Sequence, residues 1–221
     1  SPDKNIQLLV THQTAGGLMY SITYKGKAVV LPSVVGMKLA NPVVSLQQFS
    51  LDHIDSVMVD ESWKPVWGEQ SQIRNNYRQL LLSLTDKSGS GIRIQLMFRV
   101  FNDGVGFRYI FPQQDKLNHF IIADELTGFA LTGDHTAFWI PGDYDTNEYA
   151  YYNSALSKVD ASGGGFAQEI HAKTFFDKNA VQTPLMMKTA EGLYINLHEA
   201  ALVNYPAMNL VDRKSTRLNS S

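Results

Sequence analysis

The chain has 221 residues, of which 44% are hydrophobic and 18% are charged, enough apolar surface for a folded core and too much for a disordered chain. Nineteen Lys and Arg residues against 21 Asp and Glu residues give a net charge of -2, so nucleic acid and anionic membrane surfaces are not expected partners. The absence of cysteine excludes disulfides, thiolate metal sites and cysteine nucleophiles.

The first clear β-hairpin is predicted at residues 18–24 and 27–31, around the turn residues Lys25 and Gly26. A second and stronger hairpin is predicted at residues 92–101 and 105–111, because Asn102-Asp103-Gly104 is a typical turn between two β-rich segments.

Further short strands are predicted at residues 79–84, 119–122, 184–188 and 192–197. No segment keeps a helical period for three turns. Many short strands without helices predict an all-β fold of two packed, mainly antiparallel sheets, in one domain over residues 1–211.

Three stretches are expected to lie outside the regular strands. Residues 160–166, with the glycine run Gly163 to Gly165, are expected to form a surface loop, and a phosphate site there is not expected because no Lys-Ser/Thr pair follows. Residues 212–221 are polar and basic and are expected to be a non-native or disordered tail. The amino terminus has no signal-peptide pattern, which leaves the compartment open because a signal peptide is removed on export.

Residues 138–149, FWIPGDYDTNEY, pass from an apolar strand into a loop rich in carboxylates and aromatic rings. Carboxylates bind Ca²⁺ and aromatic faces pack against sugars, so this loop is the first candidate for function. Asp143, Asp145 and Asn147 match positions 1, 3 and 5 of an EF-hand, but Glu148 replaces the required glycine and Ser154 the final glutamate. The alternative is that Asp143 and Asp145 only cap turns.

A second aromatic segment is Trp63-Lys64-Pro65-Val66-Trp67-Gly68-Glu69, followed by Arg74. It could form a sugar-binding surface. The favoured interpretation is a buried loop in which the two indoles close one end of the sandwich and Arg74 binds backbone carbonyls.

His198 and Glu199 follow the predicted strand at residues 192–197. Adjacent residues of a strand point to opposite faces, so joint acid/base catalysis by this pair is not expected and a structural role is favoured, although Glu199 could line a ligand site. The remaining histidines lack the spacing of metal ligands.

Four segments together resemble the N-terminal domain of glycoside hydrolase family 97, in the family's order: residues 63–75, 101–109, 138–149 and 192–202. The resemblance is to the α-glucosidases that process starch. It implies a β-super-sandwich of the galactose mutarotase type, joined in the same polypeptide to a (β/α)₈ barrel that carries the catalytic carboxylates, and a small C-terminal β-domain. No catalytic residue is therefore expected in this chain, which should be inactive by itself.

The resemblance also implies a calcium-dependent, exo-acting enzyme that cleaves α-linked oligosaccharides such as malto-oligosaccharides, with α-galactosidase activity as the variant within the family. By motif position Glu148 would donate one carboxylate to a Ca²⁺ in the barrel's active site, and the barrel would supply further ligands. A periplasmic or exported location is implied as well. Two other classes remain open, a stand-alone carbohydrate-binding module and a mutarotase-like enzyme.

Overall fold

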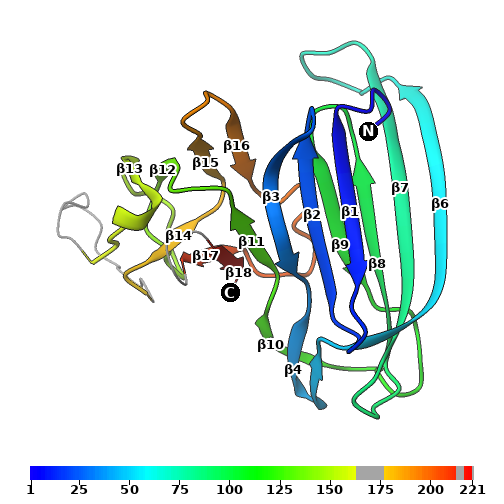
Figure 1. Cartoon of the computed structure of the whole chain (residues 1–221). Coiled ribbons are helices and arrows are strands. Elements are labelled where there is room, and N and C mark those ends of the chain that lie inside the picture. The colour runs from blue at the N-terminus through cyan, green and yellow to red at the C-terminus, as the bar shows by residue number, and fades with distance from the viewer. Residues whose placement is uncertain (163–176, 213–216, 221) are drawn as a thin grey trace. The chain divides into compact units, whose positions relative to one another are not determined.

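The computed structural model describes residues 1–162, 177–212 and 217–220, with only the backbone described for the last four. The chain divides into two compact units, Ser1–Asp124 and Glu125–Ser221 (Figure 1). Among the described residues the regular structure consists of β-strands and one short 3₁₀ helix, η1 (Leu156–Lys158). The predicted all-β class is confirmed.

Unit 1 contains two larger antiparallel sheets and a small one. One larger sheet contains β1 (Ile6–His12), β2 (Leu18–Tyr24) and β3 (Lys27–Val34). The other is formed in order by β6 (Phe49–Trp63), β7 (Ile73–Asp86), β8 (Arg93–Val100) and β9 (Val105–Ile110). The small sheet has the order β10 (Ile121–Glu125), β4 (Met37–Asn41) and β5 (Val43–Leu46).

Aromatic residues join the two larger sheets of unit 1. Tyr20 of β2 packs against Phe98 of β8 and Phe107 of β9, with ring centroids 6.1 and 6.0 Å apart. Tyr20 and Phe98 are almost fully buried, and burial raises the pKa of the Tyr20 phenol. The two sheets therefore pack face to face, as the predicted sandwich requires.

Both hairpins predicted in unit 1 are confirmed. Strands β2 and β3 turn at Lys25 and Gly26, which have φ values of 50° and 78°, and two successive positive φ values suit the twist of a hairpin. Strands β8 and β9 pair on either side of the Asn102-Asp103-Gly104 turn.

Unit 2 contains two sheets. One has the order β11 (Gly128–Leu131), β18 (Arg217–Ser220), β17 (Asn209–Asp212) and β14 (Ala180–Gln182). The other has the order β13 (Tyr152–Ala155), β12 (Thr136–Trp139), β15 (Leu185–Lys188) and β16 (Tyr194–Leu197). The strands predicted at residues 184–188 and 192–197 are confirmed as β15 and β16.

Two expectations concern the less regular stretches. Residues 163–166 of the expected glycine-rich loop lie outside the described residues. At the other stretch, Asp212 ends β17 and residues 217–220 form β18, whose backbone pairs with β11 and β17. A non-native origin of residues 212–221 stays a prediction.

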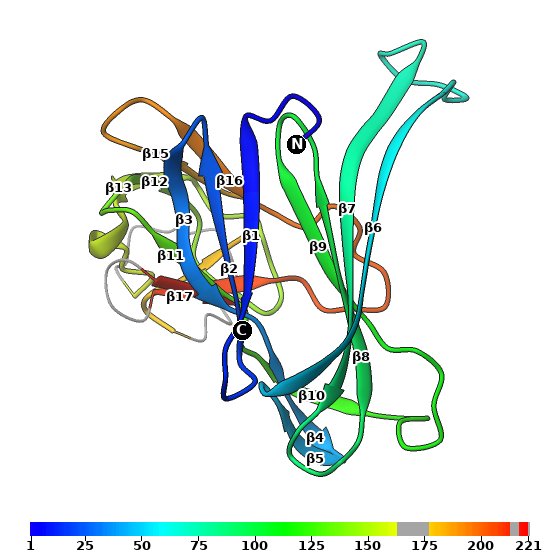
Figure 2. The same ribbon diagram turned by 45° about the vertical axis from the view of Figure 1, so that its right-hand side comes forward.

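Strands β6 and β7 form a long hairpin that extends past the ends of β8 and β9 (Figure 2). Its tip includes residues 63–69, which were predicted to form a buried loop at the end of the sandwich. That prediction is wrong: the relative exposure is 52% for Trp63 and 87% for Trp67.

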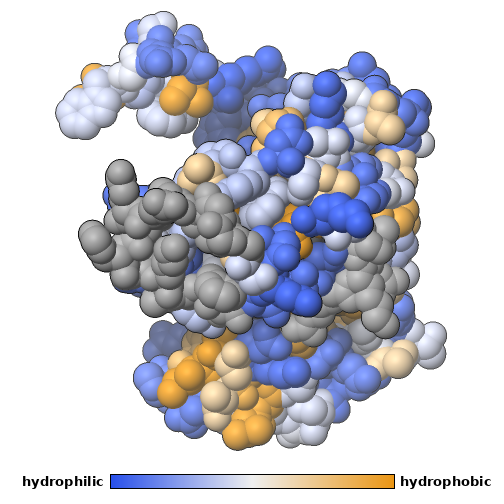
Figure 3. Space-filling view, turned by 90° about the vertical axis from the view of Figure 1, so that its left-hand side faces the viewer, coloured by the Kyte–Doolittle hydropathy of each residue, from blue (hydrophilic) through white to orange (hydrophobic). Residues whose placement is uncertain are grey.

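The face drawn in Figure 3 is mostly hydrophilic, with hydrophobic residues gathered near the lower edge of the picture. In the described part of the chain, no helix has the length and apolar character needed to cross a membrane.

Candidate functional site

The candidate loop, residues 140–151 of unit 2, leaves the end of β12 and is attached at once to β14. The Gly142 N–H donates to the Ala180 carbonyl at 2.8 Å, and the Gln182 N–H donates to the Ile140 carbonyl at 3.2 Å. A Cβ atom at position 142 would lie 2.6 Å from the Ala180 Cβ, so this close approach requires glycine.

Asp143 organises the next turn from a buried position. Its Oδ1 accepts the N–H groups of Asp145 and Thr146 at 2.8 and 3.1 Å, an arrangement in which the side chain replaces a backbone turn partner. Its Oδ2 accepts the Tyr149 hydroxyl at 2.6 Å. Burial and the Asp143 carboxylate raise the pKa of Tyr149 to about 12. The turn-capping interpretation of Asp143 is therefore confirmed.

Two side chains that the sequence did not single out hold the rest of the loop. The Gln182 amide donates to the carbonyls of Pro141 and Thr146, at 2.9 and 2.7 Å, and so closes the loop from β14. Tyr152 stacks on Trp139 with centroids 5.0 Å apart, and also packs against Ile140 and Tyr149. Gln182 is distant from the loop in sequence, so no local sequence pattern predicts that it binds the loop.

Glu148 lies on this ordered loop with its side chain exposed. Its backbone N–H donates to Thr146 Oγ1 at 3.1 Å, while the carboxylate makes no hydrogen bond or ion pair within the described ranges. The neighbouring carboxylate of Asp145 is exposed as well. The carboxylate of Asp143 already accepts hydrogen bonds from within the loop.

A complete calcium site is not formed by the described residues. Among them no three His, Asp or Glu side chains gather as metal ligands, whereas Ca²⁺ takes six to eight oxygens. The exposed Glu148 carboxylate is available as a single ligand and does not form a metal site with its described neighbours.

The tip of the β6–β7 hairpin belongs to unit 1. Arg74 donates through Nε and Nη2 to the two carboxylate oxygens of Asp60, both at 2.7 Å, and these bonds lower the pKa of Asp60. On the opposite face of the hairpin, Asn75 donates to Glu61 at 2.8 Å. Arg74 therefore links the two strands of the hairpin through Asp60. The prediction that Arg74 binds backbone carbonyls is wrong.

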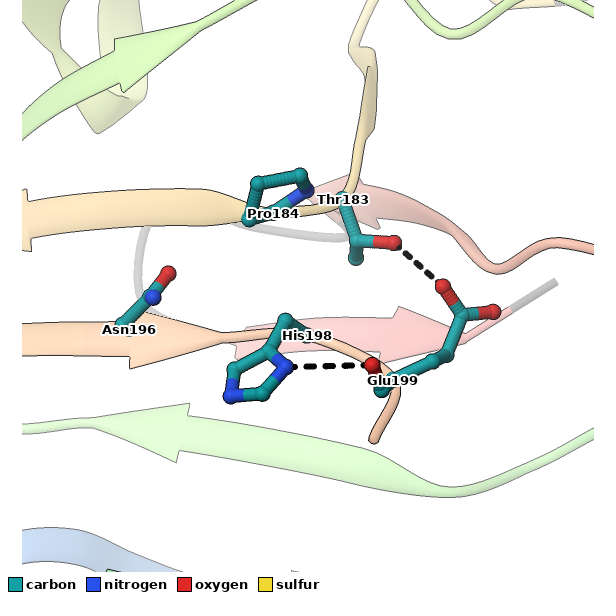
Figure 4. A pocket seen from close by; sticks show the side chains of 5 residues that line it. All are labelled: Thr183, Pro184, Asn196, His198 and Glu199. Atoms are coloured by element: carbon teal, nitrogen blue, oxygen red, sulfur yellow. Dashed lines mark hydrogen bonds between the residues drawn. The ribbon is translucent and has the colours of Figure 1, made fainter. Parts of the chain in front are cut away.

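A shallow depression of about 360 Å³ in unit 2 is lined by Thr183, Pro184, Asn196, His198 and Glu199 (Figure 4). Glu199 accepts the Thr183 hydroxyl at 2.8 Å through Oε2 and the Met208 N–H through Oε1. The His198 imidazole points away from that carboxylate, with Nδ1 3.1 Å from the Glu199 carbonyl oxygen. Glu199 thus joins three chain segments, which agrees with the favoured structural role.

The described histidines are dispersed. His12 Nε2 lies 2.8 Å from the Phe49 carbonyl oxygen, and His135 Nε2 lies 3.3 Å from Thr132 Oγ1. Burial lowers the pKa of His135 despite the nearby Asp134. His171 lies outside the described residues.

Two similar proteins are both named as retaining alpha-galactosidases. The chain is 26% identical over its full length to a retaining alpha-galactosidase of Bacteroides thetaiotaomicron, and covers 31% of that protein. It is 24% identical to a probable retaining alpha-galactosidase of Streptomyces bingchenggensis, with 92% of the chain and 30% of the relative aligned. The chain therefore spans less than a third of these relatives.

Solved structures agree in fold. A glycoside hydrolase family 97 enzyme from Pseudoalteromonas sp. strain K8, in complex with acarbose, superposes with a TM-score of 0.85 at 28% identity. The match covers all of this chain and 31% of that enzyme. A beta-arabinopyranosidase, only 20% identical, shares the fold with a TM-score of 0.82.

The sequence profile of the glycosyl-hydrolase 97 N-terminal family matches residues 1–220, nearly the whole chain. The resemblance found in the four sequence segments is confirmed. This chain belongs to the glycoside hydrolase family 97 N-terminal domains.

Proposed function

We propose that this domain is the accessory part of a calcium-dependent, exo-acting α-glucosidase. In this proposal the domain presents Glu148 to a Ca²⁺ in the active site of a (β/α)₈ barrel carried by the same polypeptide. The catalytic acid and base lie in that barrel, so the 221 residues by themselves are inactive. The full-length protein is exported, in a Gram-negative cell to the periplasm.

The metal proposal depends on one observation, that Glu148 is exposed on a loop that hydrogen bonds hold in place. Asp143, Gln182 and Tyr149 hold residues 141–149 by hydrogen bonds at 2.6 to 3.1 Å, and yet the Glu148 carboxylate at the end of this ordered segment is exposed. A preordered loop presents a ligand with little loss of conformational entropy. The loop exposes the carboxylate of Glu148 together with that of Asp145, and in the proposed shared Ca²⁺ site the remaining oxygens come from the barrel, water and substrate.

The substrate proposal rests on relatives. The Pseudoalteromonas sp. strain K8 enzyme binds acarbose, a variant of it binds panose, and both structures are 28% identical to this chain. Panose consists of glucose units, which favours α-glucosides. The retaining alpha-galactosidase of Bacteroides thetaiotaomicron is 26% identical, so α-galactosides are the competing substrates.

The experiment that tests the proposal compares hydrolysis of p-nitrophenyl α-glucoside and α-galactoside by the full-length protein and by this chain. The full-length protein should cleave the glucoside, lose activity with a calcium chelator and regain it with added Ca²⁺, while this chain stays inactive. Preference for the galactoside would overturn the sugar assignment. Activity unchanged by the chelator would overturn the role of calcium, and activity of the chain alone would place the catalytic residues here.

A stand-alone carbohydrate-binding module is the second candidate, favoured by the exposed indoles of Trp63 and Trp67. Exposed aromatic faces at a hairpin tip can stack on sugar rings. Calorimetric titration of this chain with malto-oligosaccharides should then give one-to-one binding that is lost in Trp67→Ala. No heat of binding would reject this candidate and leave the accessory role.

A further inference from the structure

One face of β6 and of the adjoining part of β7 in unit 1 exposes large apolar side chains, with the polar Ser56, Asp60 and Arg78 among them, and nothing in that unit covers it. The core-side face is defined by Leu82 and Leu84 of β7, which are buried. In the antiparallel register Ile54 of β6 lies opposite Leu82, and Met58 lies opposite Arg78, further along the same face. Residues directly opposite in an antiparallel pair share a face, so Ile54 and Met58 point to the core side.

These two side chains are nevertheless exposed. The relative exposure is 54% for Ile54 and 65% for Met58, whereas Leu82 and the residue opposite it on β8, Leu96, are almost fully buried. Leu80, between Leu82 and Arg78 on β7, is only half-buried. The core of the sandwich therefore ends at β7.

The facing sheet ends before it reaches β6. Among the described strands β1 pairs with β2 alone. On its other edge Ser1 binds the backbone N–H and C=O of Ile6, and beyond Ile6 no described strand pairs with that edge. Leu8 and Val10, on the same face of β1 as the buried Ile6, are only half-buried. In both views β1 is nearer to β9 and β8 than to β7 and β6, which lie further away on the same side (Figures 1 and 2).

An open backbone edge thus borders an uncovered apolar face. Neighbouring strands lie about 4.8 Å apart, so one or two strands added to β1 would extend the first sheet over β7 and β6. Alternate side chains of the added strand would bury Ile54, Met58 and Leu80, and its backbone would pair with β1. The same added element would therefore pair with the free edge of β1 and bury the exposed apolar side chains of β6 and β7.

The length of the relatives indicates which segment could cover this face. The chain covers 31% of the Bacteroides thetaiotaomicron alpha-galactosidase and 31% of the Pseudoalteromonas sp. strain K8 enzyme, so most of their polypeptide lies beyond the matched part. We propose that a β-strand from the polypeptide following residue 221 in the full-length enzyme pairs with the free edge of β1 and covers the core-side face of β6 and β7. This inference uses the longer polypeptide of the proposed function, but neither its metal nor its substrate.

Thiol labelling of the full-length enzyme tests the inference, with Met58→Cys and the matched variant Val57→Cys. Val57 is the adjacent residue, on the outer face, with 46% exposure. The chain has no native cysteine, so peptide mapping assigns labels in this domain to the introduced thiol. In the native enzyme the thiol of Met58→Cys should react at least about tenfold more slowly than the thiol of Val57→Cys, and the two should react equally fast in denaturant. Equal native rates would overturn the proposal.

A photo-crosslinking residue at position 58 identifies the occupant. A crosslink to a peptide beyond residue 221 of the same molecule is expected. A crosslink within residues 1–221, or one between two copies that disappears on dilution, would overturn the proposal. Neither readout depends on activity, so a failure here is distinct from failure of the proposed α-glucosidase function.

Discussion

The hydroxyl of Tyr149 donates a hydrogen bond of 2.6 Å to Oδ2 of Asp143, six residues earlier, and both side chains are buried. This bond closes the segment that contains Glu148. The exposed Glu148 carboxylate and the buried hydrogen bond that holds the loop are thus neighbours in sequence with opposite environments.

Replacement of Tyr149 by Phe should destabilise the domain by about 1–3 kcal/mol, because a buried hydrogen bond to a carboxylate is lost. Chemical denaturation of the full-length enzyme and the variant measures this difference. An unchanged free energy of unfolding would show that the bond contributes nothing.

The same residue gives a pH prediction. Because the pKa of Tyr149 is raised to about 12 in the folded protein, above its ordinary value of 10.0, its stabilising contribution is complete below pH 10 and is lost as pH rises through about 12. Difference titration of tyrosinate absorbance against Tyr149→Phe should reveal one phenol titrating near 12. A difference spectrum that instead titrates near the ordinary value of 10.0 would contradict the buried hydrogen bond.

Glu148→Gln in the full-length enzyme should lower calcium affinity by about tenfold or more, because one anionic ligand becomes neutral. Hydrolytic activity at limiting Ca²⁺ should fall with it, while the circular dichroism spectrum stays the same. Asp145→Asn is the matched control, an exposed carboxylate on the same loop, and should retain affinity and activity. If the two variants behave alike, the assignment to Glu148 is wrong.

Gly142→Ala should cost about 1–3 kcal/mol of stability, because the new methyl group would lie 2.6 Å from the Ala180 Cβ in the attachment of the loop to β14. Gly106→Ala, within β9, is the control, since an added Cβ there meets nothing within 4 Å. Thermal unfolding of both variants measures the effect. Similar melting temperatures would show that the loop attachment relaxes freely.

Glu199→Ala should destabilise unit 2 by about 1–3 kcal/mol, because the carboxylate accepts hydrogen bonds from Thr183 and Met208. The turnover number of the full-length enzyme should stay within about twofold, since the role is structural. His198→Ala, at an exposed neighbouring side chain, should change neither quantity. A large loss of turnover in a stably folded Glu199→Ala enzyme would instead point to a role in the reaction.

Prediction from sequence succeeded where local chemistry decides the structure. The turn residues Lys25 and Gly26, and Asn102 to Gly104, specify their hairpins because few residues adopt such turns at low cost. Prediction failed for β6, whose residues are nearly all exposed, so no alternation of apolar and polar side chains marks the strand. Its pairing with β7 along its whole length is a long-range property.

Local sequence was enough to establish the all-β class, the main hairpins, the family and the loop in which Glu148 lies, because turn chemistry and the four family segments are contained in short stretches of chain. The folded arrangement was needed to learn that Asp143 is a buried turn cap, that Gln182 closes the loop from β14, that Arg74 pairs with Asp60, and that the indoles of Trp63 and Trp67 are exposed. These outcomes depend on burial and on contacts between residues distant in sequence, which hydrophobic periodicity and motif spacing do not encode.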